Sequence, residues 1–563
     1  MLSSRRVKKI VTAAEMREID RLTTERYAVS SLLLMEQAAV ATAREITAQL
    51  GNLSKRKALI LCGRGNNGGD GAALARFLCN AGASVVLILF GRVEDTKGDA
   101  HTNFEIARRL NGFVDGSPSL TYPLQFIECV DVSIWEDIKW ACAHGFDVIV
   151  DALFGTGLTR PLEGIYAKVV EHLDHLSTTR ERNVNDRPLF VSLDIPSGLD
   201  ADSQTPIGPA VHADLTITFI AAKPANVLPP ASHFNGRLVI ADIGSPLSLV
   251  ESAPSKLFLT EPRDARDWLK ATRYTPDSYK NTHGHAFVIA GSRGMTGAVV
   301  LCADAAMRAG AGLVTVATPV SAMQGVASRL MPEVMTAPLA ETESGSIAAE
   351  ASEQLKRLMM RATVVAIGCG LTSESESTRR FVRETVERRT TPVVLDADGL
   401  NALAPWPATL RGTTEAPIIL TPHEGEMLRL LGATDRSALV ERTRVVSEFA
   451  AAHNLVVVLK GTRTLVAAPD GRVFVNPTGN AGLGTAGSGD TLTGVITGFL
   501  AQAFATLKER ADAVAATVAA VYVAGLAGDL AARELGMRTM TASDVRRNLS
   551  TAVRALDPEG ETP

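Results

Sequence analysis

Short apolar runs, each followed by a turn rich in glycine and polar residues, recur along the whole chain. In the first half, the run Lys57–Cys62 is followed by GRGNNGGDG, an apolar helical pattern and a second run, Ser84–Phe90. This order predicts a parallel sheet with crossover helices. Upstream, Thr12 and Glu15 have the spacing of a helix capping box, and a second helix is expected over 31–50. Ligands of such sheets bind where the strands end.

The same alternation starts again after a stretch rich in proline, serine and polar residues. The runs in HAFVIAGSRG, VVAIGCG, VVLDADG, IILTPHEG and VVLKGT each lead into a glycine, aspartate, histidine or lysine. A chain of 563 residues is too long for one ordinary core. We therefore predict an α/β protein of two doubly wound domains, residues 1–250 and 254–563, with the boundary near Pro254.

Composition and charge exclude several classes of protein. Hydrophobic residues make up 46%, charged residues 21%, and the formal charge is −4, so we expect neither nucleic acid nor a membrane as a partner. Six cysteines without a CxxC pair indicate reduced thiols and a cytoplasmic protein. The basic start lacks the apolar region of a secretory signal, and the alanine-rich segment 513–528 is expected to be a buried helix. We also expect a homo-oligomer.

Three predicted strand ends in the first half carry oxygen-bearing side chains beside glycine turns. The turn Gly63–Gly71 follows the first strand, Asp151 ends a second, and Asp194 and Ser197 follow a third. A single aspartate at a strand end is often only a helix cap. Three such ends together favour a shared ligand site. Hard oxygen ligands suit a hard cation better than zinc, which prefers nitrogen and sulfur.

The most glycine-rich stretch of the second half is NPTGNAGLGTAGSGD, Asn476–Asp490, and an apolar helical pattern follows it directly. Glycines allow close approach of a ligand, and the free N–H groups of a helix start bind anions such as a diphosphate. The stretch lacks the Gly-Lys-Ser/Thr ending of a Walker loop. Asp490 stands where a base could reach a hydroxyl beside the phosphate. The alternative is a tight turn in which Asp490 only caps the helix.

The motifs NNGGDG, VDALFGTG and LDIPSGLDAD resemble the YjeF N-terminal domain, the Rossmann-like NAD(P)H-hydrate epimerase family, over Val11–Ile243. The resemblance implies a potassium ion at Asn67, Asp151 and Ser197, and a catalytic role for Asp194. Gln204, where the family has glycine, and details of GTGLTRPLEG depart from its pattern. The implied contacts to the hydrated nucleotide are Asn66, Asn67, Gly68, Gly69, Asp70, Gly155, Thr156, Gly157, Leu158, Thr159, Arg160, Pro161, Tyr166 and Asp194.

Seven ordered motifs of the second half, GSRGMTGA, PEVMT, GCG, DADGLNAL, TPHEGEM, KGTRT and NPTGNAGLGTAGSGD, resemble the ribokinase-like NAD(P)H-hydrate dehydratases over Asp264–Leu556. The family implies Asp490 as catalytic base. Glu424, where proline is common, and Thr491, where an aliphatic residue is usual, depart from its pattern. The implied substrate contacts are Ala298, Gly370, His423 and Asp490, and the implied nucleotide contacts are Lys460, Gly461, Thr462, Arg463, Thr464 and Gly489.

Together the resemblances imply a bifunctional repair enzyme for hydrated NADH and NADPH (NADHX and NADPHX). The first half would interconvert the R and S forms. The second would return the S form to NAD(P)H with ADP and a magnesium ion, giving AMP and phosphate. Two alternatives stay open: a ribokinase-like kinase for vitamins or sugar alcohols, and a first half that is only a binding or assembly module.

Overall fold

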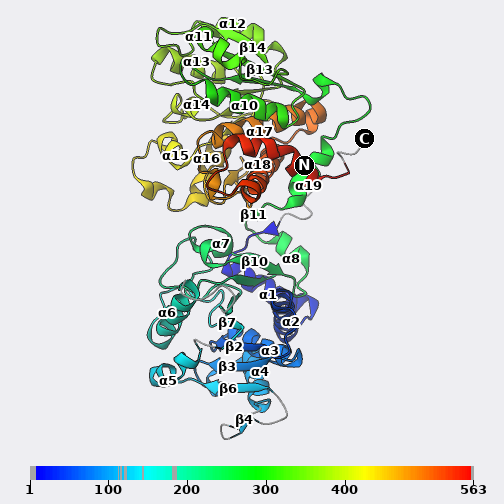
Figure 1. Ribbon diagram of the computed structural model, residues 1–563, viewed down its shortest axis with the longest axis vertical. Helices are drawn as coiled ribbons and strands as arrows, with labels where there is room; N and C mark the ends of the chain where they lie inside the picture. Colours follow the sequence, from blue (N-terminus) through cyan, green and yellow to red (C-terminus); the bar gives the residue numbers. More distant parts are fainter. Residues whose placement is uncertain are drawn as a thin grey trace. The chain divides into compact units, whose positions relative to one another are not determined.

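The structure is a computed structural model that describes residues 8–111, 113–114, 117–118, 123–142, 145–179 and 187–559. The chain divides into two compact units, which Figure 1 shows in the colours of the sequence. The N-terminal unit runs from Lys9 to Ser255, and the C-terminal unit contains the described residues from Lys256 onward together with Lys8. Each unit is built around its own sheet.

The N-terminal unit has a seven-stranded sheet whose neighbouring strands are all paired in parallel. Short apolar runs such as KALILC form its central strands, because a strand covered on both faces must be apolar throughout. In sheet order the strands are β10 (Arg237–Ala241), β9 (Leu215–Phe219), β8 (Leu189–Leu193), β7 (Val148–Ala152), β2 (Lys57–Cys62), β3 (Ser84–Leu89) and β6 (Leu124–Glu128). A separate antiparallel pair is β4 (Phe113–Val114) with β5 (Ser117–Pro118).

Helices cover both faces of this sheet, and one apolar cluster fills each side. On one side Ala38 of α2, Leu74 of α3 and Phe104 of α4 are buried together, and on the other Trp135 of α5 packs with Val169 of α6. The helices are α1 (Ala13–Tyr27), α2 (Ser31–Leu50), α3 (Asn66–Asn80), α4 (Gly98–Arg109), α5 (Val132–Cys142), α6 (Gly164–Thr178), α7 (Pro224–Val227) and α8 (Leu247–Ser252).

The C-terminal sheet has eleven strands and is mixed: β19 runs antiparallel to both of its neighbours, and the other strand pairs described are parallel. In sheet order the strands are β1 (Lys8–Lys9), β11 (Leu257–Leu259), β20 (Val473–Val475), β19 (Leu465–Ala467), β18 (Val456–Leu459), β17 (Ile418–Leu420), β16 (Val393–Leu395), β15 (Val364–Ile367), β12 (His285–Ile289), β13 (Leu313–Pro319) and β14 (Met335–Leu339).

One large apolar cluster joins this sheet to helices α9, α10, α17, α18 and α19. Among the described residues, the helix Ala513–Leu535 is long and apolar enough to cross a membrane, but 72% of its apolar window is buried inside the protein, as expected for a core helix. The helices are α9 (Pro262–Ala271), α10 (Thr296–Arg308), α11 (Val320–Ala327), α12 (Ala351–Leu358), α13 (Glu376–Glu387), α14 (Asp398–Asn401), α15 (Glu424–Leu431), α16 (Arg442–His453), α17 (Ser488–Gln502), α18 (Ala513–Leu535) and α19 (Ala542–Leu556).

The predicted α/β class with parallel sheets is confirmed, as are the capping box of α1 and the bounds of α2. The glycine-rich turn after β2 is shorter than predicted, because α3 already begins at Asn66. A Cβ atom on Gly68 would lie 1.8 Å from the carbonyl oxygen of Gly63, and one on Gly71 would lie 2.7 Å from the sulfur of Cys62. These glycines therefore let the helix pack tightly on the strand ends.

Candidate functional site

The first candidate site lies where four neighbouring strands of the N-terminal sheet end. β9, β8, β7 and β2 are adjacent and parallel, so the residues that follow them meet at one edge. Asn67 comes from the first turn of α3, Asp151 from β7, and Asp194 and Ser197 from the turn after β8. The sequence singled out these four residues, and the fold brings them to this edge.

Asp151 and Ser197 form a buried hydrogen-bonded pair. The Ser197 hydroxyl donates to Oδ1 of Asp151 at 2.6 Å, and the Ser197 backbone N–H donates to Oδ2 at 2.8 Å. Ser192 and the backbone of Leu153 donate the third and fourth bonds to this carboxylate. Burial raises the pKa of Asp151, although these donors act in the opposite direction. The carboxylate thus holds the turn after β8 against β7.

Asn67 and Asp194 face one another across Gly155. A Cβ atom on Gly155 would lie 3.0 Å from Oδ2 of Asp194 and 3.4 Å from Oδ1 of Asn67. Both polar atoms of the Asn67 side chain are buried, and neither has a hydrogen-bond partner among the described residues. Buried amides are normally paired, so this one indicates a place for a ligand or an ion.

Lys223 is a residue of this edge that the sequence does not single out, since a solvated surface lysine would explain it equally well. The structure excludes a solvated lysine, because the side chain is 1% exposed. Its ammonium donates to Oδ1 of Asp194 at 2.6 Å, to the Thr218 hydroxyl at 2.9 Å and to the Phe219 carbonyl at 3.2 Å. The Thr218 hydroxyl also donates to Oδ1 of Asp194. Only a buried lysine beside the strand end would have been a signal, and burial is invisible in one sequence.

One oxygen of Asp194 is therefore fixed and the other faces the site. Oδ1 is held by Lys223 and Thr218, while Oδ2 lies toward Gly155 and Asn67. Asp194 also has a φ of 62°, which is unusual for a residue with a side chain. The tight turn after β8 stores that strain in order to aim the carboxylate.

Two further carboxyl groups stand near this pair. Burial raises the pKa of Asp20, on α1, to about 6, with Lys223 acting against the shift and Asp194 adding to it. Burial raises the pKa of Asp70 well above its usual value, and the charges of Asp194 and Asp20 add to the effect.

The loop after β7 and the helix that follows it complete this edge. The Tyr166 hydroxyl donates to the carbonyl of Phe90 at 2.9 Å, and its ring packs edge-on against Phe154 at 4.9 Å between centroids. Tyr166 is thus anchored beside the loop 155–161. Leu158 of that loop is buried, whereas Thr159 and Arg160 are exposed.

The second candidate site lies at the matching edge of the C-terminal sheet. β15, β16, β17 and β18 are neighbours and parallel, and Cys369, Asp396, His423 and Lys460 follow them in that order. Helix α17 begins at Ser488 over the same edge, so Asp490 lies in its first turn. Gly487, with a φ of 85°, is the N-cap of α17, and Asp490 is therefore not a mere cap.

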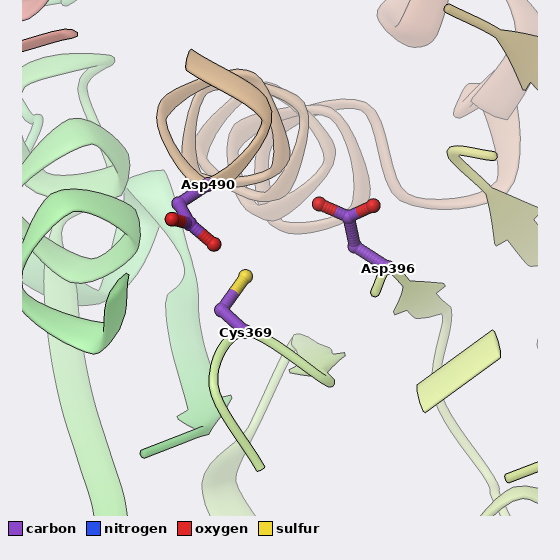
Figure 2. Close-up of side chains that lie close together, drawn as sticks. All are labelled: Cys369, Asp396 and Asp490. Carbon is purple, nitrogen blue, oxygen red and sulfur yellow. The ribbon is translucent and has the colours of Figure 1, made fainter. Parts of the chain in front are cut away.

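Asp490, Cys369 and Asp396 form a compact cluster, with one ligand atom of each within 4.8 Å of the others. Figure 2 shows the two carboxylates on either side of the sulfur of Cys369. Burial raises the pKa of Asp490 to about 6, a hydrogen bond from Cys369 acts against the shift, and the charge of Asp396 adds to it. The pKa of the Cys369 thiol is raised well above its usual value by its hydrogen bond with Cys302 and by burial. A thiol that keeps its proton is a poor metal ligand.

Asp396 and Lys460 are a hydrogen-bonded charge pair. Nζ of Lys460 lies 2.7 Å from Oδ1 of Asp396 and 3.6 Å from Glu426, and the Thr493 hydroxyl donates to Oδ2 of Asp396 at 2.7 Å. Burial alone would raise the pKa of Asp396, but Lys460 holds it below its usual value. Burial lowers the pKa of Lys460, and the two carboxylates outweigh it and raise that pKa.

The sequence interpretation quoted DADGLNAL but assigned no role to Asp396, although an aspartate at a strand end was the signal used for Asp151. Gly489 lies in contact with this pair. A Cβ atom there would lie 3.4 Å from Nζ of Lys460 and 3.7 Å from Oδ2 of Asp396. Gly489 is thus beside the charge pair, within the first turn of the helix.

His423 caps the helix that follows it. Its ring Nδ1 accepts hydrogen bonds from the backbone N–H groups of Gly425 at 3.0 Å and Glu426 at 3.3 Å. In return, the Glu426 carboxylate accepts a hydrogen bond from the backbone N–H of His423. An accepting Nδ1 leaves the ring proton on Nε2, which lies 3.5 Å from Glu426. The side chain is 55% exposed, so Nε2 remains accessible to a ligand.

The remaining predicted residues of the second half lie at the start of α10 and in the loop after β18. A Cβ atom on Gly370 would lie 3.2 Å from that of Ala298, so the two backbones meet at the start of α10. The loop after β18 is fixed at its far end, where Arg463 donates to the Pro477 carbonyl at 2.9 Å. Thr491 is buried and its hydroxyl has no partner among the described residues, which is the cost of a hydroxyl where the family has an aliphatic side chain.

Comparison with known proteins agrees with the family resemblance of each half. Residues 31–225 match the family described as YjeF-related protein N-terminus, and residues 286–551 match the family NAD(P)H-hydrate dehydratase. The bifunctional NAD(P)H-hydrate repair enzyme Nnr of Moorella thermoacetica is 40% identical over 554 residues, 98% of each chain. The enzymes of the same name from Thermofilum pendens and Escherichia coli are 35% and 32% identical, over 98% and 89% of this chain and 98% and 85% of theirs.

A crystal structure of the ADP/ATP-dependent NAD(P)H-hydrate dehydratase of Bacillus subtilis, co-crystallised with ATP and Mg²⁺, is 30% identical. The match covers 53% of the present chain and 98% of the Bacillus subtilis enzyme, with a TM-score of 0.45. These full-length relatives are all named bifunctional NAD(P)H-hydrate repair enzymes, which favours repair over the kinase alternative. This chain belongs to the family of bifunctional NAD(P)H-hydrate repair enzymes.

Proposed function

We propose that the N-terminal unit interconverts the R and S forms of NADHX and NADPHX, and that the C-terminal unit returns the S form to NADH or NADPH with ADP, giving AMP and phosphate. The observation that carries the second half is Asp490: a carboxylate with a pKa of about 6 in the first turn of α17. Such a group is ionised at neutral pH and basic enough to take a proton.

In the dehydration, Asp490 takes the proton of the substrate hydroxyl as that oxygen attacks the terminal phosphorus of ADP. The bond from that phosphorus to the bridging oxygen breaks, and AMP leaves. The new phosphate ester then leaves as phosphate while the neighbouring ring carbon loses a proton, which restores the double bond. The backbone N–H groups at the start of α17 favour the negative charge of the transferred group. Ala298, Gly370 and His423 would hold the nicotinamide end.

Lys460 and Asp396 organise the phosphate end. Because the Lys460 ammonium is bound to Asp396 and lies close to Glu426, it acts mainly by holding the loop 460–464 against Gly489. That loop and Gly489 would contact ADP. Magnesium favours oxygen ligands and keeps several waters. Asp396 is engaged by Lys460 and Thr493, and Cys369 keeps its proton, so oxygens of the ADP phosphates would be the main ligands.

In the epimerisation, Asp194 would act as the acid–base group through Oδ2, and the hydroxylated carbon of the substrate would change its configuration. The arrangement that supports this is the free Oδ2 beside the unpartnered Asn67 amide. We assign contacts to the nucleotide to residues 66–70, 155–161 and Tyr166, as in the family. This activity would make the first half more than a binding module.

A potassium ion fits the residues of this site in part. The oxygen of Asn67 is unpartnered, and the Ser197 hydroxyl accepts from Phe154 and donates to Asp151, which leaves one lone pair. Asp151 would join only by sharing an oxygen that already accepts two hydrogen bonds. The ion would supply positive charge beside the nucleotide, and Asp151 would orient Ser197 toward it.

The proposal is tested with a mixture of the R and S epimers of NADHX. With ADP and magnesium, the purified protein should restore the absorbance of NADH from both epimers, because epimerisation feeds the S form to dehydration. The protein without nucleotide should only equilibrate the epimers, which chromatography resolves. Recovery of the S fraction alone would remove the epimerase assignment, and no recovery with ADP or ATP would remove the dehydratase assignment.

A further inference from the structure

Arg442 has a buried guanidinium with two nitrogen atoms that have no hydrogen-bond partner within the described part of the chain. It is the first residue of α16, its side chain is 13% exposed, and its Nε and Nη2 atoms are buried with no hydrogen-bond partner among the described residues. The carboxylate of Glu424 is 3.7 Å from Nε, which is too far for a hydrogen bond. Burial lowers the pKa of Arg442, with Glu424 acting against the shift, but arginine keeps its charge in proteins.

The guanidinium lies directly against the loop after β18. A Cβ atom on Gly461 would be 2.9 Å from Nη2 of Arg442, so the guanidinium packs against the backbone of this glycine. The other cationic side chains of this loop are engaged. Lys460 is bound to Asp396, and Arg463 donates to the Pro477 carbonyl. Arg442 therefore has unsatisfied N–H groups beside the segment where ADP is proposed to bind.

A buried charge without hydrogen bonds is costly, so its persistence calls for a ligand. The planar fork of an arginine suits two oxygens of one phosphate or carboxylate better than any neutral group. Glu424 supplies such a carboxylate at a poor distance, and its side chain is 51% exposed and free to move away.

We propose that Arg442 binds a phosphate oxygen of the nucleotide at the loop 460–464, and that Glu424 competes with the nucleotide for it. The inference rests on the proposed use of ADP by this unit. In the absence of nucleotide, Glu424 neutralises Arg442 loosely. When ADP binds, the Arg442 guanidinium donates hydrogen bonds to the phosphate, and the Glu424 side chain moves into solvent. The acid thereby lowers the affinity of the enzyme for nucleotide.

The test measures ADP binding by calorimetry and the KM for ADP in the full-length protein. Arg442→Gln should weaken ADP binding by about tenfold to hundredfold, since a charge-assisted hydrogen bond is lost. Glu424→Gln should tighten it by about twofold to fivefold, as expected for a partly exposed ion pair. In the double variant, the effect of Glu424→Gln should vanish, because its target is gone.

Arg444 provides a matched control on the same helix. Its side chain is 63% exposed and lies 3.4 Å from Glu448, so Arg444→Gln should leave ADP binding unchanged. The KM for the S epimer and the rate of epimerisation should be unchanged in all variants. A purely structural arginine would instead lower the melting temperature when replaced and leave the affinity of the folded fraction intact.

Wild-type affinity for ADP in a folded Arg442→Gln variant overturns the inference. If that variant does not fold, Glu424→Gln decides, since an exposed acid can be changed without risk to the fold: unchanged ADP affinity overturns the inference as well. A failed inference is distinct from a failed function. In the first case the wild-type protein still dehydrates the S epimer with ADP; in the second it does so with neither ADP nor ATP.

Discussion

Replacement of Asp490 by asparagine removes a single basic oxygen and keeps the size of the side chain. We expect the dehydration of the S epimer to fall by about 10²–10⁴, the usual contribution of a positioned base. ADP binding should persist, because the loop 460–464 and the amides of α17 are unchanged. Epimerisation should be untouched, since it belongs to the other unit.

The raised pKa of Asp490 gives this prediction a second, independent readout. Its carboxyl has a pKa of about 6 in the fold against an ordinary 3.8, and the dehydration rate of the wild type should therefore fall tenfold per pH unit below about 6. A carboxyl whose pKa is raised stabilises the fold below its unfolded pKa and loses that contribution as the pH rises through the folded value. At neutral pH the ionised group thus costs up to about 3 kcal/mol, and asparagine should restore part of it.

The assay is single-turnover dehydration of purified S epimer between pH 5 and about 8, with calorimetry for ADP and thermal melting beside it. Asp490→Asn should be slow, bind ADP, lose the acidic limb near pH 6 and melt no earlier than wild type at neutral pH. A rate within a few-fold of wild type, or an acidic limb that persists in the variant, would refute the reasoning. Asp435→Asn, at an exposed turn, is the matched control.

Three further outcomes are expected. Lys223→Met leaves Oδ1 of the buried Asp194 with only the hydrogen bond from Thr218. Epimerisation should therefore fall at least about tenfold, and the N-terminal unit should lose on the order of 3–5 kcal/mol of stability. Dehydration of pure S epimer should stay normal, and unchanged epimerisation would contradict the role of Lys223. Epimerisation should be faster in potassium than in a large organic cation, and Asp151→Ala should weaken it; equal rates in both salts would exclude the ion. A fragment that begins at Ser255 should fold and dehydrate the S epimer, because the C-terminal unit has its own core; an insoluble fragment would show that the units depend on each other.

The sequence predicts local features of this protein well because short-range physics decides them. Apolar runs form strands of three to seven residues, and the Thr12 capping box starts α1. Asp151 and Asp490 could be chosen because each stands beside glycines at the end of an apolar run or the start of a helix. Where the turn after β2 ends was harder to predict, since Asn66 begins a helix whose glycines are needed for packing that only the folded sheet creates.

Long-range partners explain what the sequence could not provide. Lys223 follows Asp194 by 29 residues and Lys460 follows Asp396 by 64. The first pair meets because β8 and β9 are neighbours in the sheet, and the second meets at the same sheet edge although β17 lies between β16 and β18. In both units a lysine holds one oxygen of an aspartate at a strand end. In the first unit this aspartate, Asp194, is the proposed acid–base group. In the second unit it is Asp396, which lies beside Asp490, and its charge adds to the effect of burial in raising the pKa of Asp490. A lysine–aspartate pair thus fixes the orientation of the proposed acid–base carboxylate in one site and lies beside the proposed base in the other.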